Sequence, residues 1–172
     1  MTKEDIYLFY RGPFSQWHRC EFEVNGVAFN CAEQYMMYHK ALAFGDSAGT
    51  RRILAANTPR EQKSLGRSVS GFDEKKWEAL REGIVFSGNY AKFAQNGPLK
   101  EALFATGHRL LAEAAPRDKI WGIGLSEDDP RAYDVLEWRG LNLLGFALTR
   151  VREVLRWEQR VVLHPLSRLR VT

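Results

Sequence analysis

The sequence predicts a single-domain α+β fold that is mainly α-helical and has a small antiparallel sheet near the N-terminus. Apolar and polar positions alternate around Asn25-Gly26, which is the strongest short-range signal for a β-hairpin. From residue 30 onward, most of the chain shows helical spacing of apolar residues between capping and stop residues. At 172 residues, the chain is long enough to bury about two thirds of its unfolded surface in one core.

The strands are predicted first in the chain. Residues 6–10 form a β-branched and aromatic run typical of a buried strand. After a loop, the hairpin delivers the chain directly into a helix over residues 30–44, with Asn30 as its N-cap and Gly45 as its stop. We expect the small sheet to pack against this helix.

The rest of the chain is predicted to be helical, apart from one strand and one long connection. We expect helices over residues 47–56, 59–65, 73–95, 99–105 and 141–157. Thr58 and Glu61 form a capping box for the second of these, and Gly66 is expected to end it. Residues 108–114 are a candidate strand, and the Gly-, Asp- and Pro-rich connection over residues 116–138 has a length typical of a functional segment.

Composition and charge narrow the class of protein. The net charge of +4 suits a small phosphorylated ligand and does not demand nucleic acid. Part of it lies in the tail, so we expect a domain of residues 1–157 and a basic, solvated extension of residues 158–172. Cys20 and Cys31 lack the spacing of a disulfide framework or zinc site, and we expect both to be reduced. No apolar leader and no run of about 18 apolar residues is present, which favours a cytoplasmic protein without membrane contacts.

The helix over residues 30–44 has the geometry of a site. Glu33 and Lys40 fall on one stripe with Met37, so an acid and an amine about two turns apart face the same surface. A plainer interpretation is also open. Glu33 stands three residues after Asn30 and would close a capping box, while Lys40 would simply be solvated.

Segments that follow this helix in the chain supply further candidate ligand-binding residues. Trp121 offers an aromatic plane beside Gly122, where a ligand can approach the backbone closely, although the third glycine of a Rossmann fingerprint is missing. Asp118 would either cap a turn or orient a ribose hydroxyl. Asn142, near the start of the last helix, would be a local cap or would mark free amides for a phosphate, with the Arg139 guanidinium beside them.

The N-terminal loop and the 65–67 segment complete the set. Arg67 is a second candidate for binding phosphate. Phe14 and Trp17 are most simply core anchors, and Ser15 and Gln16 between them could reach a ligand. The four histidines show no metal spacing and neither cysteine has a nucleophile context, so we predict no metal, no cofactor and no Ser-His-Asp or Cys-His site.

These segments, in this order, resemble the NADAR (NAD and ADP-ribose) superfamily, the YbiA-like proteins. The resemblance runs from about Phe9 to Leu155 and is carried by residues 14–17, the Ala-Glu-Gln-Tyr start of the helix, and residues 65–67, 118–124 and 138–145. It implies chemistry at a ribose anomeric carbon. Related members act as N-glycosidases on the first intermediates of riboflavin biosynthesis, and others remove ADP-ribose from guanine bases in DNA.

The short chain favours the first activity, with a phosphoribosylamino-pyrimidine as substrate and ribose 5-phosphate as product. DNA is a partner only under the alternative. In the family the 118–124 segment borders the pocket, which implies a ligand-binding role there. The predicted substrate-binding residues are Phe14, Ser15, Trp17, Arg67, Asp118, Trp121, Gly122, Arg139 and Asn142.

Breaking an N-glycosidic bond builds positive charge at C1′ and needs a carboxylate nearby and a proton for the leaving nitrogen, for which we choose Glu33. Lys40 admits two roles. It anchors a phosphate, or it attacks the ring-opened C1′ as an imine-forming amine, which demands a depressed pKa. A module that binds ADP-ribose or NAD without turnover and an interaction protein with a vestigial pocket are the other possibilities, but the presence of both Glu33 and Lys40 argues for catalysis.

Overall fold

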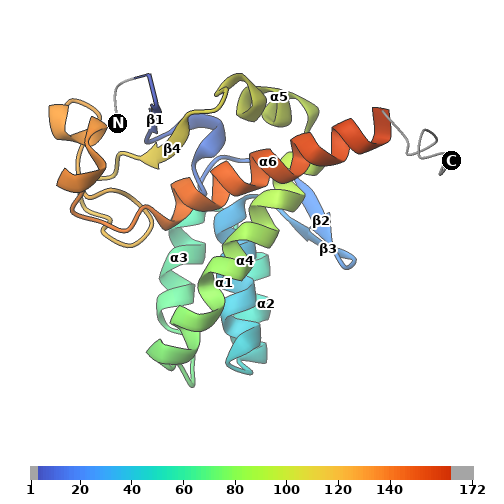
Figure 1. Ribbon diagram of the computed structural model, residues 1–172. Helices are drawn as coiled ribbons and strands as arrows, with labels where there is room; N and C mark the ends of the chain where they lie inside the picture. The colour runs from blue at the N-terminus through green and yellow to red at the C-terminus, as the bar shows by residue number, and fades with distance from the viewer. Residues whose placement is uncertain (1–3, 164–172) are drawn as a thin grey trace, which may run out of the picture.

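Two small sheets lie against six α-helices in residues 4–163, the part of the chain that the computed structural model describes (Figure 1). The strands are β1 (Ile6–Phe9), β2 (Phe22–Val24), β3 (Val27–Phe29) and β4 (Leu110–Glu113). The helices are α1 (Ala32–Ala43), α2 (Ser47–Ala55), α3 (Pro59–Arg67), α4 (Glu74–Gln95), α5 (Gly97–Ala105) and α6 (Leu143–Leu163). Short 3-10 turns are η1 (Gly12–Phe14), η2 (Pro130–Tyr133) and η3 (Val135–Glu137). The mainly helical α+β class is therefore confirmed.

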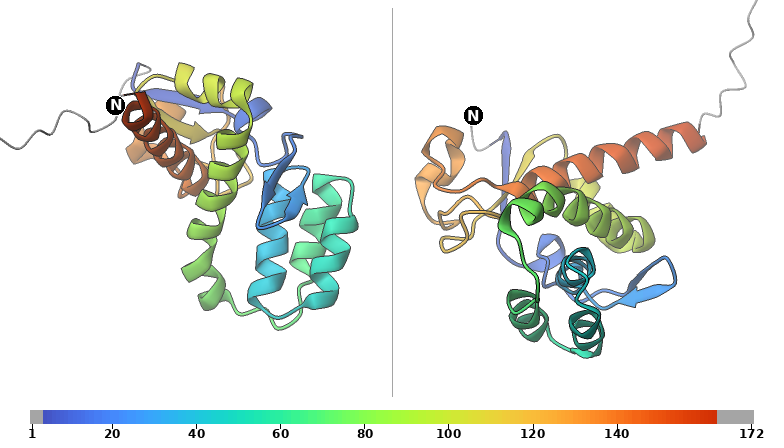
Figure 2. Two further views of the ribbon diagram at one scale, coloured as in Figure 1. Left: turned by 90° about the vertical axis from the view of Figure 1, so that its right-hand side faces the viewer. Right: turned by 90° about the horizontal axis from the view of Figure 1, so that it is seen from below.

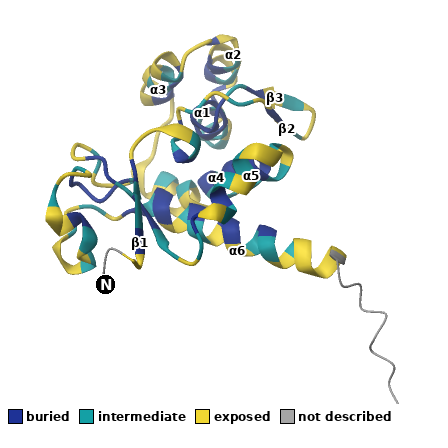
Figure 3. Cartoon of the chain, turned by 90° about the horizontal axis from the view of Figure 1, so that it is seen from above, coloured by how far each residue is buried: buried dark blue, intermediate teal, exposed yellow. Residues whose placement is uncertain are grey.

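Helix α4 connects the group formed by α1, α2 and α3 to α6. Helices α1, α2 and α3 stand side by side, and α6 crosses above them next to β4 (Figures 1 and 2). Helix α4 packs against both α1 and α6, and buried residues follow the faces that turn toward one another (Figure 3). None of the helices in residues 4–163 has the length and apolar character needed to cross a membrane.

The β2–β3 hairpin forms as predicted and packs on α1. Asn25 and Gly26 have φ values of 53° and 78°, the left-handed conformation that a two-residue type I′ turn requires. Phe22 pairs with Phe29 across the antiparallel ladder, and the ring centroid of Phe29 lies 5.0 Å from that of Tyr35 in α1. This aromatic cluster fixes the hairpin at the side of α1.

Strand β1 pairs in parallel with β4, from Ile6 opposite Leu110 to Phe9 opposite Glu113. The sequence indicated both strands but not their pairing, because a parallel pair joined through a hundred residues leaves no local signature. Strand β4 is also shorter than the expected 108–114. The pairing places Glu113 at the end of the strand, where the chain enters the long connection.

The N-cap of α1 is Cys31, so the expectation that Asn30 caps this helix was wrong. The Gln34 amide N–H donates to Cys31 Sγ at 3.5 Å, and Gln34 Oε1 accepts the Asn30 amide N–H at 2.8 Å. The Asn30 side chain instead accepts a hydrogen bond from Gln62 of α3. Gln34 therefore supplies the reciprocal capping bond, and the capping interpretation of Glu33 is wrong.

Two helix ends also differ from expectation. Gly66 does not end α3, which continues to Arg67. A Cβ at this position would collide with the Met37 side chain of α1, which explains why the residue is a glycine. The glycine serves close packing between the two helices. Helix α6 continues past residue 157 to Leu163, and residues 164–172 of the expected basic extension lie outside the described residues.

We expect Gly66→Ala to destabilise the protein by about 1–3 kcal/mol, because the added methyl group must displace Met37 from a packed interface. The matched control is Gly83→Ala, at an exposed position of α4 where a Cβ meets no atom within 4 Å. This control should gain up to about 1 kcal/mol from the higher helix propensity of alanine. Urea unfolding of both variants measures the difference, and equal effects at the two sites would contradict the packing role.

Candidate active site

Glu33 lies in the first turn of α1 and is only 2% exposed. Its amide N–H donates to the Gln16 carbonyl at 3.0 Å, which ties the N-terminal loop to the start of the helix. The Trp17 side chain hydrogen-bonds to the Glu33 carboxyl group, but carboxyl oxygen Oε1 is buried without a hydrogen-bond partner among the described residues. A buried carboxyl oxygen left unpaired is costly, and such groups are typical of functional sites.

Burial raises the pKa of Glu33 from 4.5 to about 7, against the charge of Lys63, the hydrogen bond from Trp17 and the charge of Arg67. The negative charge of Asp118 contributes to this raised pKa. A carboxyl group that titrates near neutral pH can accept or donate a proton under physiological conditions.

Glu113, which the sequence analysis did not identify, belongs to the same group of charges. Burial, together with the charges of Asp118 and Glu33 and against that of Lys63, raises its pKa to about 7. Carboxyl oxygen Oε2 of Glu113 is buried and accepts no hydrogen bond from residues 4–163. The one available signal was a glutamate ending the otherwise apolar run Leu-Leu-Ala-Glu, just before the long connection. Lys63 carried no signal, since a lysine on an amphipathic helix is ordinary.

The 118–124 segment is a tight turn against the end of β4. Asp118 Oδ1 accepts the amide N–H groups of Ile120 at 3.0 Å and Trp121 at 2.8 Å, so this residue caps the turn, as one of its two interpretations required. A Cβ on Gly122 would lie 2.8 Å from the Glu113 carbonyl oxygen, and the glycine is therefore explained by packing against β4. The ribose contact of Asp118 stays a prediction.

Asn142 connects this turn to β4. It is fully buried with a φ of 52°; its Oδ1 accepts the Glu113 N–H at 3.0 Å and its Nδ2 donates to the Leu111 carbonyl at 3.0 Å. Both side-chain groups are thus used by strand backbone, and Asn142 positions Glu113. Arg139 is exposed, and its charge helps to lower the pKa of Asp129, so its phosphate contact also stays a prediction.

In the N-terminal loop, Phe14 packs in the core and Trp17 lies at the Glu33 carboxyl group. Phe14 is buried, with its ring centroid 5.6 Å from that of Phe9. Trp17 is 41% exposed, so the expectation that it anchors the core was wrong. Ser15 holds the loop in shape, because its Oγ accepts the Trp17 N–H at 3.1 Å and its carbonyl accepts Lys92 Nζ at 3.0 Å.

Lys40 is half-buried, and the interpretation that it is simply solvated is wrong. Its Nζ donates to the Gly66 carbonyl at 2.8 Å and lies 4.2 Å from the ring centroid of Phe72 and 5.5 Å from that of Trp77. Burial lowers the pKa of Lys40, and the charge of Arg67 lowers it further. The charge of Arg67 lowers the pKa values of both Glu33 and Lys40. Among the cations, Lys63 lowers the pKa of Glu33 most.

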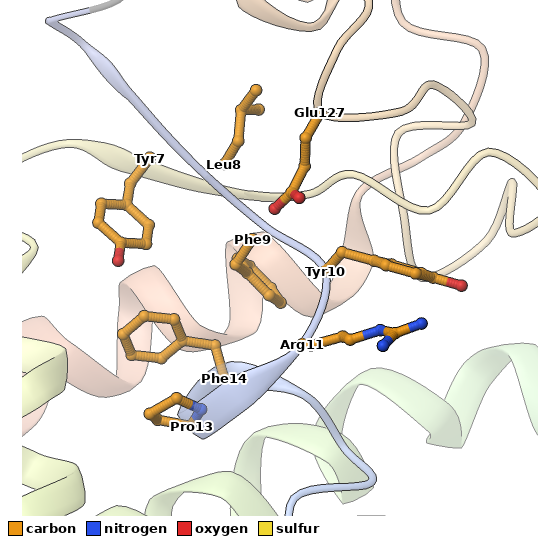
Figure 4. A pocket seen from close by; sticks show the side chains of 8 residues that line it. All are labelled: Tyr7, Leu8, Phe9, Tyr10, Arg11, Pro13, Phe14 and Glu127. Atoms are coloured by element: carbon orange, nitrogen blue, oxygen red, sulfur yellow. The ribbon is translucent and has the colours of Figure 1, made fainter.

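A separate cavity of about 430 Å³ lies beside β1 (Figure 4). It is lined by Tyr7, Leu8, Phe9, Tyr10, Arg11, Pro13, Phe14 and Glu127. The side chains of Tyr10 and Arg11 extend away from the rings of Tyr7 and Phe14 in this view. The cavity thus borders β1 and the turn after it, whereas the charges around Glu33 come from α3, β4 and the 118–124 segment.

Metal ligands are not grouped anywhere in residues 4–163, where no set of three His, Cys, Asp or Glu side chains is arranged to hold an ion. Cys20 and Cys31 are both free. Burial raises the pKa of the Cys31 thiol to about 11, so this residue is an inert cap.

Comparison with known proteins extends these observations. The NADAR domain model matches residues 8–156. An N-glycosidase of Acanthamoeba polyphaga mimivirus is 40% identical over 163 residues, covering 87% of this chain and 96% of the viral protein. The protein irg-1 of Caenorhabditis elegans is 43% identical over 131 residues, covering 75% of this chain and 62% of that protein.

A solved structure shows the same fold. The NMR structure of the Escherichia coli protein YbiA superposes with a TM-score of 0.75 at 27% identity, over 93% of this chain and 90% of YbiA. The resemblance seen in the sequence is therefore confirmed, and the chain belongs to the NADAR family.

Proposed function

We propose that this protein is an N-glycosidase that hydrolyses the bond between a ribose C1′ and a nitrogen. The observation that carries the proposal is the buried Glu33 carboxyl group, which has one unpaired oxygen and a pKa raised to about 7. Two relatives support it, since the mimivirus protein and YbiA of Escherichia coli both carry the name N-glycosidase.

The reaction needs a negative group near C1′, because positive charge develops there as the bond to nitrogen breaks. Glu33 supplies this group in a water-poor environment, where its charge acts strongly. Trp17 is exposed beside the carboxyl group and offers a ring face to a base or a ribose. A ring-opened C1′ also gives the Lys40 amine a target, since displacement of the nitrogen would form an imine that water then hydrolyses.

The substrate proposed is a phosphoribosylamino-pyrimidine intermediate of riboflavin biosynthesis, and the product is ribose 5-phosphate. Lys63 and Arg67 support a phosphorylated ligand, because both place positive charge near the Glu33 carboxyl group. A direct assay follows ribose 5-phosphate release from this substrate and compares it with ADP-ribose release from ADP-ribosylated guanosine. Faster turnover of the guanosine compound would replace the proposed substrate by the alternative one. Loss of release in EDTA, with recovery on adding a divalent ion, would contradict the predicted metal-free reaction.

We expect Glu33→Gln to lower turnover by at least about 100-fold while the fold is kept, because the amide preserves the shape of the carboxyl group but cannot transfer a proton. Circular dichroism checks the fold. Turnover close to that of the unmodified protein would remove Glu33 from the catalytic residues.

The same variant has a predicted effect on stability. Between pH about 4.5 and about 7 the unfolded chain releases the Glu33 proton while the folded protein retains it, so the folded protein loses stability as the pH rises through this range. The amide does not titrate. Glu33→Gln should therefore melt at a higher temperature than the unmodified protein at pH 8, and the difference should shrink at pH 4. A lower melting temperature at pH 8 would contradict the buried, costly carboxylate.

For Lys40 we expect the imine role, because burial beside Phe72 and Trp77 lowers its pKa and so increases the fraction of uncharged amine. Borohydride added during turnover should trap the sugar on the peptide that contains Lys40. Lys40→Arg should lose most turnover, because arginine keeps the charge but forms no imine. Lys75→Arg, at an exposed position of α4, is the matched control. Near-normal turnover of Lys40→Arg without a trapped adduct would assign Lys40 to phosphate binding.

A further inference from the structure

A single carboxyl group cannot meet both demands of the proposed reaction at once. It must be ionised to stabilise charge at C1′ and protonated to supply the leaving nitrogen. We propose that Glu113 is a second catalytic residue, which holds the proton for the leaving nitrogen while Glu33 stays ionised toward C1′. This inference rests on the proposed N-glycosidase function.

The placement of Glu113 supports this role. Its N–H is held by Asn142 Oδ1 at 3.0 Å and its carbonyl accepts the Ile123 N–H at 2.8 Å, so the backbone is fixed on both sides. Glu113 Oε2 and Glu33 Oε1 are both buried, and neither has a hydrogen-bond partner within the described part of the chain. Two unpaired carboxyl oxygens from different elements, facing common charges, form a site that a polar ligand would complete.

The surroundings of the two carboxyl groups favour different protonation states. Glu33 lies in the first turn of α1, where the helix dipole favours a negative charge, and the Trp17 side chain hydrogen-bonds to its carboxyl group. Two cations, Lys63 and Arg67, also favour its ionised form.

Asp118 raises the pKa of both glutamates, and the repulsion between Glu33 and Glu113 acts on both, so the difference lies in the cations. Lys63 and Arg67 lower the pKa of Glu33, whereas Lys63 is the only cation among the residues acting on the pKa of Glu113. Burial raises the pKa of each carboxyl group to about 7, and the additional cation beside Glu33 favours the arrangement with the proton on Glu113.

The proposed step is balanced. The Glu113 proton passes to the leaving nitrogen, the C1′–N bond breaks with its electron pair going to nitrogen, and the uncharged Lys40 amine bonds to C1′ and loses a proton to Glu33. Glu33 returns this proton to the ring oxygen as the ring opens to the protonated imine, and water then hydrolyses the imine to ribose 5-phosphate. The proton released as the Lys40 amine is freed restores Glu113.

Two substrates that differ in the leaving group test the assignment. A phosphoribosylamino-pyrimidine needs a proton on its nitrogen, whereas 4-nitrophenyl β-ribofuranoside 5-phosphate releases a stable phenolate without one. We expect Glu113→Gln to slow the first reaction by about 100-fold or more and the second by less than about threefold. Glu33→Gln should slow both, and Glu101→Gln, at an exposed position of α5, should slow neither. Equal slowing of both reactions in Glu113→Gln, or no slowing of either, would overturn the proposal.

A titration that needs no substrate separates this inference from the proposed function. In protein labelled with ¹³C at glutamate carboxyl groups, the signal missing from Glu113→Gln should titrate near neutral pH, and in Glu33→Gln it should move to lower pH. A Glu113 signal that titrates below pH about 5 would overturn the proton-donor role whatever the substrate. Inactivity of the unmodified protein on every ribosyl compound, with Glu113 titrating near neutrality, would overturn the proposed function instead.

Discussion

The burial of a carboxyl group at the first turn of α1 is the constraint on which the site depends. Glu33 is 2% exposed, and an ionised carboxylate in such a position is stable only with compensating partners. The hydrogen bond from its N–H to Gln16 brings the N-terminal loop against the helix, and this loop carries Trp17 to the carboxyl group. Lys63 and Arg67 reach the same place from α3, which the absence of a side chain at Gly66 allows to pack closely on α1.

Carboxyl groups outnumber the cations that act on both glutamates of the site. Three carboxyl groups, those of Glu33, Glu113 and Asp118, lie within electrostatic range of one another, with Lys63 as the cation acting on both glutamates. Like charges in a medium of low dielectric constant resist simultaneous ionisation, so Glu33 and Glu113 keep protons to higher pH than free glutamate does. The fold thereby stores a transferable proton where bond cleavage at an anomeric carbon would use it.

Local patterns predicted most of the elements but little of their assembly. Asn25-Gly26 specified the hairpin, and Thr58 was correctly identified as an N-cap because its side chain needs only the helix that follows it. Gly66 was misjudged, since a glycine that stops a helix and one that packs against a neighbouring helix look alike in sequence. Glu33 was singled out as a candidate by the helical stripe that it shares with Lys40 and by its place in the Ala-Glu-Gln-Tyr segment. Glu113 was not, because its chemistry arises from residues of α1 and α3 that are distant in the chain.

The parallel pairing of β1 with β4 has a consequence for the order in which the protein is built. Ile6 and Leu110 are neighbours in space but are separated by 104 positions in the chain, as the difference of their numbers shows. Contacts of such high sequence separation form late, since the closure entropy of the intervening chain precedes any gain from pairing. During synthesis, α1 to α4 can assemble before Asn142, which anchors the end of β4, has been made. The nascent chain can therefore bury Glu33 early, whereas Glu113 is held in place only after Asn142 has been made.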